Sequence, residues 1–227
     1  MPGRLQNGDL MGFLAQVKSK AEDHEKIINS PEYIETERQR KEKEDERRNQ
    51  ELEFVKKRRY EYNINKLPKI YRDLEDLYGD RATANRYKND SLFICGKPGT
   101  GKTVLATFIL RELFENDIGG RFISFPKFIQ YIQMNFDDCQ DDIREITTNQ
   151  ELIIFDDFGA ERLTDFVRVT IYNIIDSRYV NKLQTIITSN WNIKEIANQI
   201  DDRIARRING MCKFIEMKGK DRTQRHD

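Results

Sequence analysis

The chain has 227 residues, with 39 lysines and arginines against 39 aspartates and glutamates, and charged residues make up 34% of it. No run of about 18 apolar residues is present, which excludes a transmembrane helix, and the first residues lack the apolar stretch of a secretory signal. Three cysteines far apart exclude a disulfide framework, and two histidines near the chain ends argue against a zinc site. We therefore expect a cytoplasmic protein with one domain and an appendage, and no membrane partner.

The amino-terminal part, residues 1–66, differs in character from residues 67–227. Ser30-Pro31-Glu32 is typical of the start of a helix. From Glu35 to Glu51 there is no apolar residue, and opposite charges recur four positions apart, which supports a helix that has no apolar face to bury. We predict a charged helical region at 1–66 that serves either as a spacer or as a partner-binding arm.

Beyond residue 66, short apolar runs alternate with amphipathic helical patterns. Strands are expected at residues 91–95, 121–125, 151–155, 184–188 and 212–217. Helices are expected at residues 103–116, 127–136 and 164–180, and two short helices follow up to about residue 209. Apolar strands separated by helices are typical of a parallel sheet with helices on both faces. The sequence therefore predicts an α/β domain at 67–227.

A phosphate-binding motif lies between the first expected strand and the first expected helix. The motif is Gly96, Lys97, Pro98, Gly99, Thr100, Gly101, Lys102 and Thr103, which matches G-x-x-x-x-G-K-[S/T]. Its glycines allow backbone N–H groups to surround phosphates at the start of a helix. Lys102 is expected to reach the β- and γ-phosphates, and Thr103 to hold Mg²⁺. We predict that these eight residues and the following Val104 bind a nucleoside triphosphate.

Polar side chains follow two other expected strands. Asp156 and Asp157 come directly after the apolar run that precedes them, and Asn190 comes just past the strand at 184–188. The carboxyl ends of parallel strands meet at one edge of a sheet, beside the phosphate loop. A carboxylate suits Mg²⁺, and a second one can orient or deprotonate an attacking water. We predict Asp156 as a metal ligand, and Asp157 and Asn190 as catalytic residues together with Lys102.

Three arginines, Arg203, Arg206 and Arg207, lie on an expected helix after Asn190. They belong either to a solvated basic tail or to an arginine finger, which is an arginine that reaches the γ-phosphate bound by a neighbouring subunit. We favour the finger for at least one of them.

The chain resembles the AAA+ bacterial replicative-helicase loaders of the DnaC/DnaI type and the related IstB transposition helpers. The resemblance is carried, within residues 67–222, by LPKIYRDLEDL, GKPGTGKT, LIIFDDFGAE, TIITSNW and RIARRI…CKFIEMKGKDR. It implies an AAA+ P-loop NTPase fold and an ATPase that uses ATP and Mg²⁺. By resemblance, the roles are Lys102 and Thr103 as the Walker A pair, Asp156 as the Mg²⁺-side acid, Asp157 as the water-activating acid, Asn190 as sensor 1 and Arg207 as the finger. Because many AAA+ proteins have the longer Glu in place of Asp157, turnover is expected to be slow.

Only 37 residues follow Asn190, fewer than the usual helical lid over the nucleotide needs. We expect a minimal or absent lid, with the adenine side closed by an adjoining subunit, so that ATP binding is linked to self-association. In such loaders the helix after the second strand contacts single-stranded DNA, which points to 127–136. However, the spacing of Phe128, Ile132 and Phe136 favours core packing.

Three functions remain open at this point. The first is an ATP-dependent loader, an oligomer that engages single-stranded DNA and holds a replicative DNA helicase through residues 1–66. The second is an IstB-like ATPase that assembles on duplex DNA and regulates a transposase. The third is an ATP-gated adaptor whose hydrolysis is incidental. Because the net charge is zero, no broad phosphate-seeking surface is evident, and Lys56–Arg59 and the basic carboxy-terminal stretch are the candidate DNA contacts.

Overall fold

The computed structural model describes residues 7–76, 79–135, 139–159, 163–219 and 221–222 of the chain. The chain divides into two compact units, Met1–Val55 and Lys56–Asp227. The division falls inside one long helix, whereas the composition of the sequence changes near residue 66. Among the helices described, none is both long and apolar enough to cross a lipid bilayer.

The first unit is helical. Helix α1 spans Asn7–Ile28, and α2 spans Pro31–Ile64. Because the first unit ends at Val55, the last turns of α2 belong to the second unit. Ser30 Oγ accepts a hydrogen bond from the backbone N–H of Tyr33 at 3.2 Å, which stabilises the start of α2. Ion pairs between residues three or four apart link exposed side chains of α2, and none of its described side chains is buried. The long charged helix is therefore present, and only its last turns meet a core, where the partly buried Tyr60 and Ile64 pack against apolar residues of the second unit.

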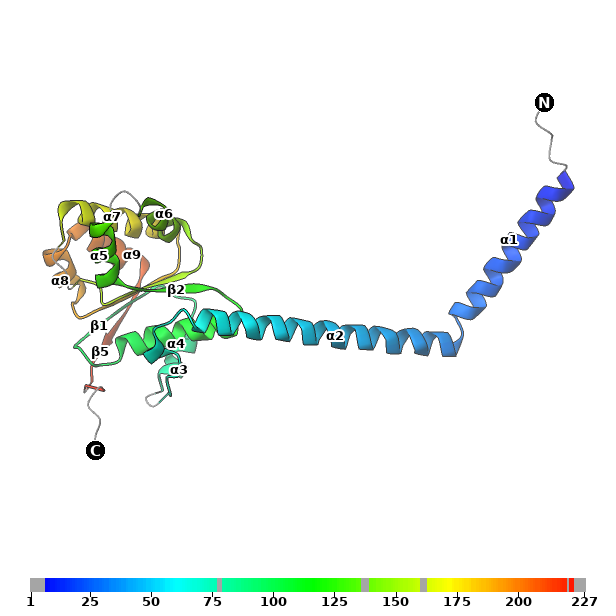
Figure 1. The fold of residues 1–227 in the computed structure, drawn as a ribbon, viewed down its shortest axis with the longest axis horizontal. Coiled ribbons are helices and arrows are strands. Elements are labelled where there is room, and N and C mark those ends of the chain that lie inside the picture. The colour runs from blue at the N-terminus through cyan, green and yellow to red at the C-terminus, as the bar shows by residue number, and fades with distance from the viewer. Residues whose placement is uncertain (1–6, 77–78, 136–138, 160–162, 220, 223–227) are drawn as a thin grey trace, which may run out of the picture. The chain divides into compact units, whose positions relative to one another are not determined.

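The second unit contains a parallel sheet. Its described strands are β1 (Leu92–Gly96), β2 (Gly120–Ser124), β3 (Leu152–Asp156), β4 (Thr185–Ser189) and β5 (Lys213–Met217). They lie in the order β2-β3-β4-β1-β5 (Figure 1), and each pair of neighbours is parallel. Every strand agrees with its predicted apolar run to within one residue at each end.

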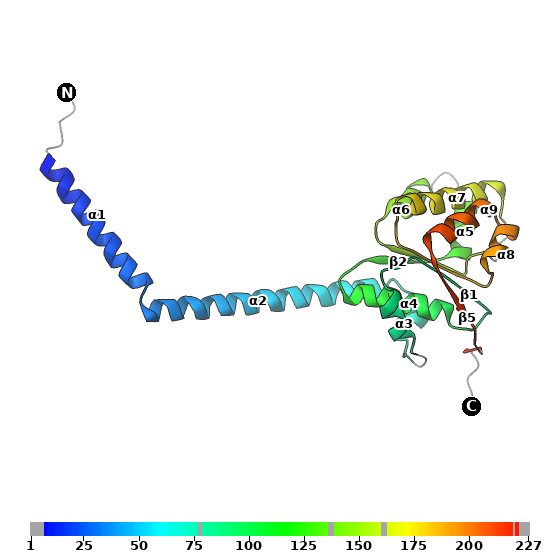
Figure 2. The same cartoon turned by 180° about the vertical axis from the view of Figure 1, so that it is seen from behind.

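Helices cover both faces of this sheet (Figures 1 and 2). On one face lie α3 (Asp80–Tyr87) and α4 (Lys102–Glu115). On the other face lie α5 (Phe125–Met134), α6 (Gln140–Thr148), α7 (Asp165–Val180), α8 (Ile193–Gln199) and α9 (Asp202–Met211). The predicted fold class, a parallel α/β sheet covered on both faces, is confirmed, although the sequence analysis did not predict α3 and α6.

The strands supply both cores because successive side chains point to opposite faces. In β1, Leu92 and Ile94 belong to the core under α3 and α4, whereas Phe93 and Cys95 belong to the core under the other helices. A strand buried on both sides must be apolar at every position, which is why the predicted runs are continuous. On α5, Phe128 and Ile132 are buried, as their spacing indicated, while Phe136 lies outside the described residues.

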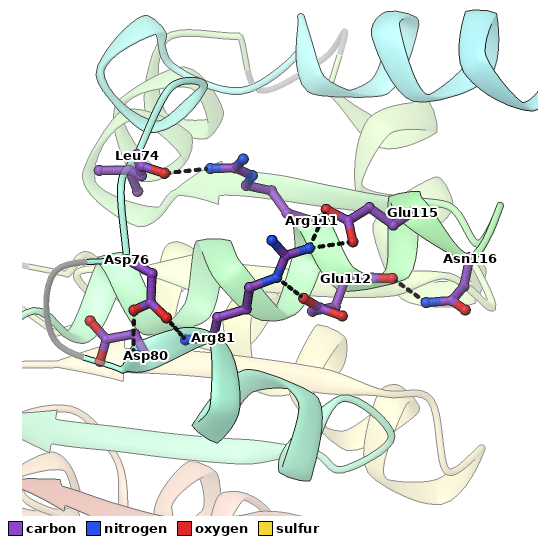
Figure 3. Close-up of polar contacts among 8 residues, drawn as sticks. All are labelled: Leu74, Asp76, Asp80, Arg81, Arg111, Glu112, Glu115 and Asn116. Carbon is purple, nitrogen blue, oxygen red and sulfur yellow. Dashed lines mark hydrogen bonds and ion pairs between the residues drawn. The ribbon is translucent and has the colours of Figure 1, made fainter.

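The segment that precedes β1 is fixed to α4 by charged side chains (Figure 3). Arg81 of α3 pairs with Glu112 at 2.8 Å and with Glu115 at 2.7 Å, both on α4. The carboxylate of Asp76 accepts hydrogen bonds from the backbone N–H groups of Asp80, at 2.7 Å, and of Arg81, at 3.2 Å. These contacts hold the buried Asp80 at the start of α3.

Candidate nucleotide-binding site

The phosphate loop joins β1 to α4 at the carboxyl edge of the sheet. Gly99 and Gly101 have φ angles of +77° and +95°, which larger residues rarely adopt, and Gly101 immediately precedes α4. A Cβ atom on Gly96 would lie 2.5 Å from the carbonyl oxygen of Met217 on the neighbouring strand β5. Glycine is therefore required at the turns of the loop and where it leaves the sheet.

The side chain of Lys102 turns back across the loop. Its Nζ donates hydrogen bonds to the carbonyl oxygens of Gly96 and Lys97, both at 2.9 Å, and to Asn190 Oδ1 at 2.8 Å. Burial lowers the pKa of the Lys102 ammonium, and the nearby carboxylates of Asp157 and Asp156 oppose this by raising it. The structure thus brings together the cation of the loop and the polar residue that follows β4.

The hydroxyl of Thr103 lies against the first acid. Thr103 Oγ1 donates to Asp156 Oδ1 at 2.7 Å, and Thr188 Oγ1 on β4 donates to the same oxygen at 2.7 Å. Burial raises the pKa of the Asp156 carboxyl above its usual range, while the two hydroxyl hydrogen bonds act in the opposite direction. The paired strands β3 and β4 thus hold Asp156 beside the start of α4.

The second acid has a constrained backbone. Asp157 has a φ angle of +60°, which is unfavourable for a residue with a side chain. Its N–H donates to Thr188 Oγ1 at 2.9 Å, and its Oδ1 accepts a hydrogen bond from Asn190 Nδ2 at 3.0 Å. Asn190 therefore contacts Lys102 with its oxygen and Asp157 with its nitrogen, so that these three predicted residues form one hydrogen-bonded chain.

The donor set fits Mg²⁺. Thr103 and Asp156 present a hydroxyl and a carboxylate oxygen to each other, and Mg²⁺ is usually bound by one or two protein oxygens together with phosphates and water. Among the residues that the structure describes, no group of three or more His, Cys, Asp and Glu side chains forms a metal cluster. With a hydroxyl and a carboxylate supplied by the protein, phosphate oxygens and water would complete the coordination of a bound Mg²⁺.

The remaining predicted loop residues shape the turn. Thr100 is buried and its Oγ1 donates to the carbonyl oxygen of Lys97 at 2.9 Å. Lys97 and Pro98 are exposed, and Val104 packs against the core beneath α4.

A hollow of about 440 Å³ opens beside the loop, at the carboxyl ends of β1, β4 and β5. Lys97, Thr100 and Asn190 line it on the loop side, and the carboxylate-bearing Glu195 and Glu216 line it as well. Lys218 lines the hollow too and pairs with Glu216 at 2.9 Å, so the hollow carries charges of both signs.

Tyr71, for which the sequence predicted no role, lies near the proposed metal ligands Thr103 and Asp156. Tyr71 ends a single 3₁₀ turn, Lys69–Tyr71, and its ring centroid is 5.7 Å from that of Phe122 on β2. Burial and the charges of Asp156 and Asp157 raise the pKa of the Tyr71 hydroxyl, whereas a hydrogen bond with Thr103 lowers it. Its only sequence signal is its place in LPKIYRDLEDL.

A second missed contact comes from the end of the chain. The N–H of Arg222 donates to the carbonyl oxygen of Gly99 at 2.8 Å, and Arg222 Nη1 pairs with Asp80 Oδ2 at 2.6 Å. A Cβ atom on Gly99 or Gly101 would lie within 3 Å of Asp221 or Arg222. The small size of these glycines therefore also admits the carboxy-terminal segment onto the phosphate loop.

The three candidate finger arginines have partners away from the phosphate loop. Arg203 pairs with Asp201 at 2.9 Å, and Arg206 pairs with Asp202. Arg207 pairs with Asp176 of α7. These partners lie on α7 or around the start of α9, so the structure places the arginines on a separate surface from Lys102.

The parallel sheet and this phosphate loop place the chain among the AAA+ P-loop nucleotide-binding proteins. A family model described as IstB-like ATP binding protein matches residues 19–226. The chain therefore belongs to the IstB-like ATP binding family, which supports nucleotide binding at this site.

Two named relatives are replicative helicase loaders. The loader DnaI of Bacillus subtilis (strain 168) is 29% identical over 112 residues, which cover 48% of this chain and 36% of the relative. The loader DnaC of Escherichia coli (strain K12) is 25% identical over 151 residues, which cover 65% of this chain and 58% of the relative. Each match thus spans less than two thirds of the relative's length.

Solved structures share the fold. A crystal structure of DnaI is similar with a TM-score of 0.57 at 22% identity, covering 66% of this chain and 88% of that chain. AMPPCP-bound DnaA from Aquifex aeolicus also gives a TM-score of 0.57, at 18% identity, covering 69% of this chain and 53% of that chain. At these identities, the structures support the fold alone.

The hydroxyl of Thr188 should set the pH dependence of metal binding. Metal binding needs the Asp156 carboxylate in its charged form, which the Thr188 hydrogen bond favours. Thr188→Val should raise the pKa of Asp156 further, so that the pH below which Mg²⁺ ceases to strengthen ATP binding moves upward. Calorimetric titration of ATP with and without Mg²⁺ between pH 5 and 8 measures this. Thr188→Ser, which keeps the hydroxyl, is the matched control, and an equal shift in both variants would contradict the assignment.

Proposed function

We propose that the chain is an ATP-dependent loader of a replicative DNA helicase onto single-stranded DNA, and that it assembles as an ATP-bound oligomer. The observation that carries the ATPase part is the hydrogen-bonded chain from Lys102 through Asn190 to Asp157, beside the Thr103–Asp156 contact. The loader part is supported by the names of two relatives, DnaI and DnaC. Residues 1–66 are proposed as the helicase-binding region and 67–227 as the ATPase domain.

Each residue of the site is assigned a separate role in ATP binding or hydrolysis. Lys102 offers a cation to the β- and γ-phosphates, and the residues of Gly96–Val104 other than Pro98 surround them with backbone N–H groups. Thr103 and Asp156 would hold Mg²⁺, which neutralises phosphate charge when bound. Asp157 accepts the proton of an attacking water that Asn190 helps to orient. The aspartate side chain is one methylene shorter than glutamate, so slow hydrolysis is proposed.

Two alternatives fit the same site. An IstB-like ATPase that assembles on duplex DNA and regulates a transposase is favoured by the description of the matched family. An ATP-gated adaptor would use bound ATP to set partner affinity, with incidental hydrolysis. Each of the three functions would use the described helices α1 and α2 as a partner-binding region.

Asp157→Asn should separate hydrolysis from binding. Asparagine keeps the size of the side chain but cannot accept the proton of the attacking water, so steady-state hydrolysis should fall about 100-fold. The affinity for Mg-ATP should stay within a few-fold of the wild type, because Lys102, Thr103 and Asp156 are unchanged. Phosphate release and calorimetry measure the two quantities, and a loss of ATP affinity equal to the loss of rate would contradict the assigned role.

The same variant tests the loader function. With the host's replicative helicase and a protein-coated circular single-stranded DNA, the wild-type chain should load the helicase only when ATP is present. Reduced loading by Asp157→Asn supports a cycle that needs hydrolysis. Unchanged loading by this variant would favour the ATP-gated adaptor, and no loading by the wild type would contradict the proposal.

A basic and aromatic hollow supports contact with single-stranded DNA. It has a volume of about 490 Å³ and lies between the chain before the 3₁₀ turn and the β2–α5 segment. Lys66 and Lys127 supply positive charge, and the exposed Tyr131 supplies aromatic surface, while Phe122 and Phe128 line the hollow from their places in the core. Sites for single-stranded nucleic acid combine backbone-tracking cations with rings on which bases stack. The hollow includes α5, the helix to which the family resemblance pointed.

Removing both lysines should weaken DNA binding in a salt-dependent way. Lys66→Ala with Lys127→Ala removes two phosphate contacts, so the slope of log affinity against log salt should become smaller by roughly 1.4 for single strands. Fluorescence anisotropy with ATP present measures this slope. Lys41→Ala with Lys43→Ala, two exposed residues of α2, is the charge-matched control. An unchanged slope would contradict the DNA site, and tighter binding to duplex than to single strands would favour the transposase regulator.

A further inference from the structure

Arg207 is held by a group of side chains on one face of α7. Its Nε donates to Asp176 Oδ1, and its guanidinium carbon lies 5.3 Å from the ring centroid of Tyr179. The pKa of the Arg207 guanidinium is raised by Asp176 and, to a smaller extent, by the nearby Tyr172. Tyr172, Asp176 and Tyr179 are spaced four and three residues apart, so they lie on the same face of the helix. We call these three side chains the α7 cradle.

The packing of α9 fixes the cradle relative to the arginine. Ile204 and Ile208 of α9 are buried in the core, so the helix cannot turn freely. A Cβ atom on Gly210 would lie 2.8 Å from the ring of Tyr179, which shows how closely this ring approaches the end of α9. Arg203 lies 4.8 Å from the ring centroid of Tyr172. The cradle is therefore a packed structure that orders Arg207 within a single chain.

Arg207 remains accessible while it is held. Its side chain is 36% exposed and that of Asp176 is 31% exposed. Asp176 binds Nε, the guanidinium nitrogen nearest the aliphatic stem, and an arginine has five N–H donors in a planar fork. The contact with Asp176 therefore fixes Nε, on the side of the guanidinium that faces the aliphatic stem, at the surface of the molecule.

The surface of α9 that carries Arg207 differs from the surface around the phosphate loop. The hollow beside the loop is lined by two lysines, Lys97 and Lys218, and by two glutamates, Glu195 and Glu216. A contact between two different surfaces of identical chains is a head-to-tail contact, and in such a contact Arg207 of one copy faces the phosphate loop of the next.

From this geometry we propose that Tyr172, Asp176 and Tyr179 are positioning residues that present Arg207 to the triphosphate bound by a second copy of the chain. The inference rests on the proposed ATPase function and its assembly. An arginine ordered before assembly loses less side-chain freedom when it meets its target. The cradle thereby sets the rate of hydrolysis in the neighbouring copy and not in its own.

Asp176→Ala tests the proposal at protein concentrations at which the wild type is assembled. Hydrolysis should fall about 10-fold, while the affinity for Mg-ATP and the unfolding temperature stay close to the wild-type values. Asp202→Ala, which removes the exposed partner of Arg206 on α9, is the matched control and should change the rate less than 2-fold. Arg207→Ala should lose at least as much as Asp176→Ala, and the double variant should be no slower than Arg207→Ala alone.

Mixing distinguishes positioning from a purely structural link between α7 and α9. An excess of Asp157→Asn chains, which keep ATP binding and an intact Arg207 but hydrolyse little ATP themselves, should restore most of the hydrolysis by Asp176→Ala chains. An unchanged rate in Asp176→Ala, or a reduced rate without rescue, would overturn the proposal. If Asp176→Ala unfolds more easily, Asp176→Asn is used with the same expectations. If the rate of hydrolysis per wild-type chain does not increase with protein concentration, the result contradicts the proposed assembly and not the role of the α7 cradle.

Discussion

The geometry of the site depends on hydrogen bonds made by the residues at and just after the end of β4. Thr188 donates to Asp156 and accepts from the N–H of Asp157, and Asn190 links Asp157 to Lys102. Because β4 lies between β3 and β1 in the sheet, it is the strand that can reach both the acids and the phosphate loop. The site is thus assembled by strand order, and the parallel register brings its parts to one edge.

Much of this arrangement could be predicted because its signals are local. A strand buried on both faces is a continuous apolar run, and each expected strand agrees with the observed one to within a residue. The phosphate loop carries its own motif, which fixes Lys102 and Thr103 in sequence. One further step was needed to predict the positions of Asp156, Asp157 and Asn190. This step is the rule that the carboxyl ends of parallel strands meet at one edge of the sheet. Their contacts with the loop follow from that rule, while their catalytic roles stay predictions.

The features that were missed depend on contacts between distant parts of the chain. Tyr71 lies near Thr103, and Arg222 pairs with Asp80, which is 142 positions earlier; no local pattern marks either contact. Arg178 is a buried cation on α7 whose guanidinium donates to backbone carbonyl oxygens, including those of Ile146 and Gln184. Burial lowers its pKa to about 10. Hydropathy alone would have placed such a residue at the surface.

The central claim is that Lys102 binds the phosphates of ATP and that Thr103 and Asp156 hold the accompanying Mg²⁺. Isothermal titration of the full chain with ATP, with and without Mg²⁺, tests it most directly. The account predicts saturable binding that Mg²⁺ strengthens, and a loss of roughly 10- to 100-fold in Lys102→Ala, because a charge-assisted contact contributes about 1.5–3 kcal/mol. Lys194→Ala, at an exposed position of α8, should bind as the wild type does. Equal binding by wild type and Lys102→Ala, or affinity that ignores Mg²⁺, would contradict the account.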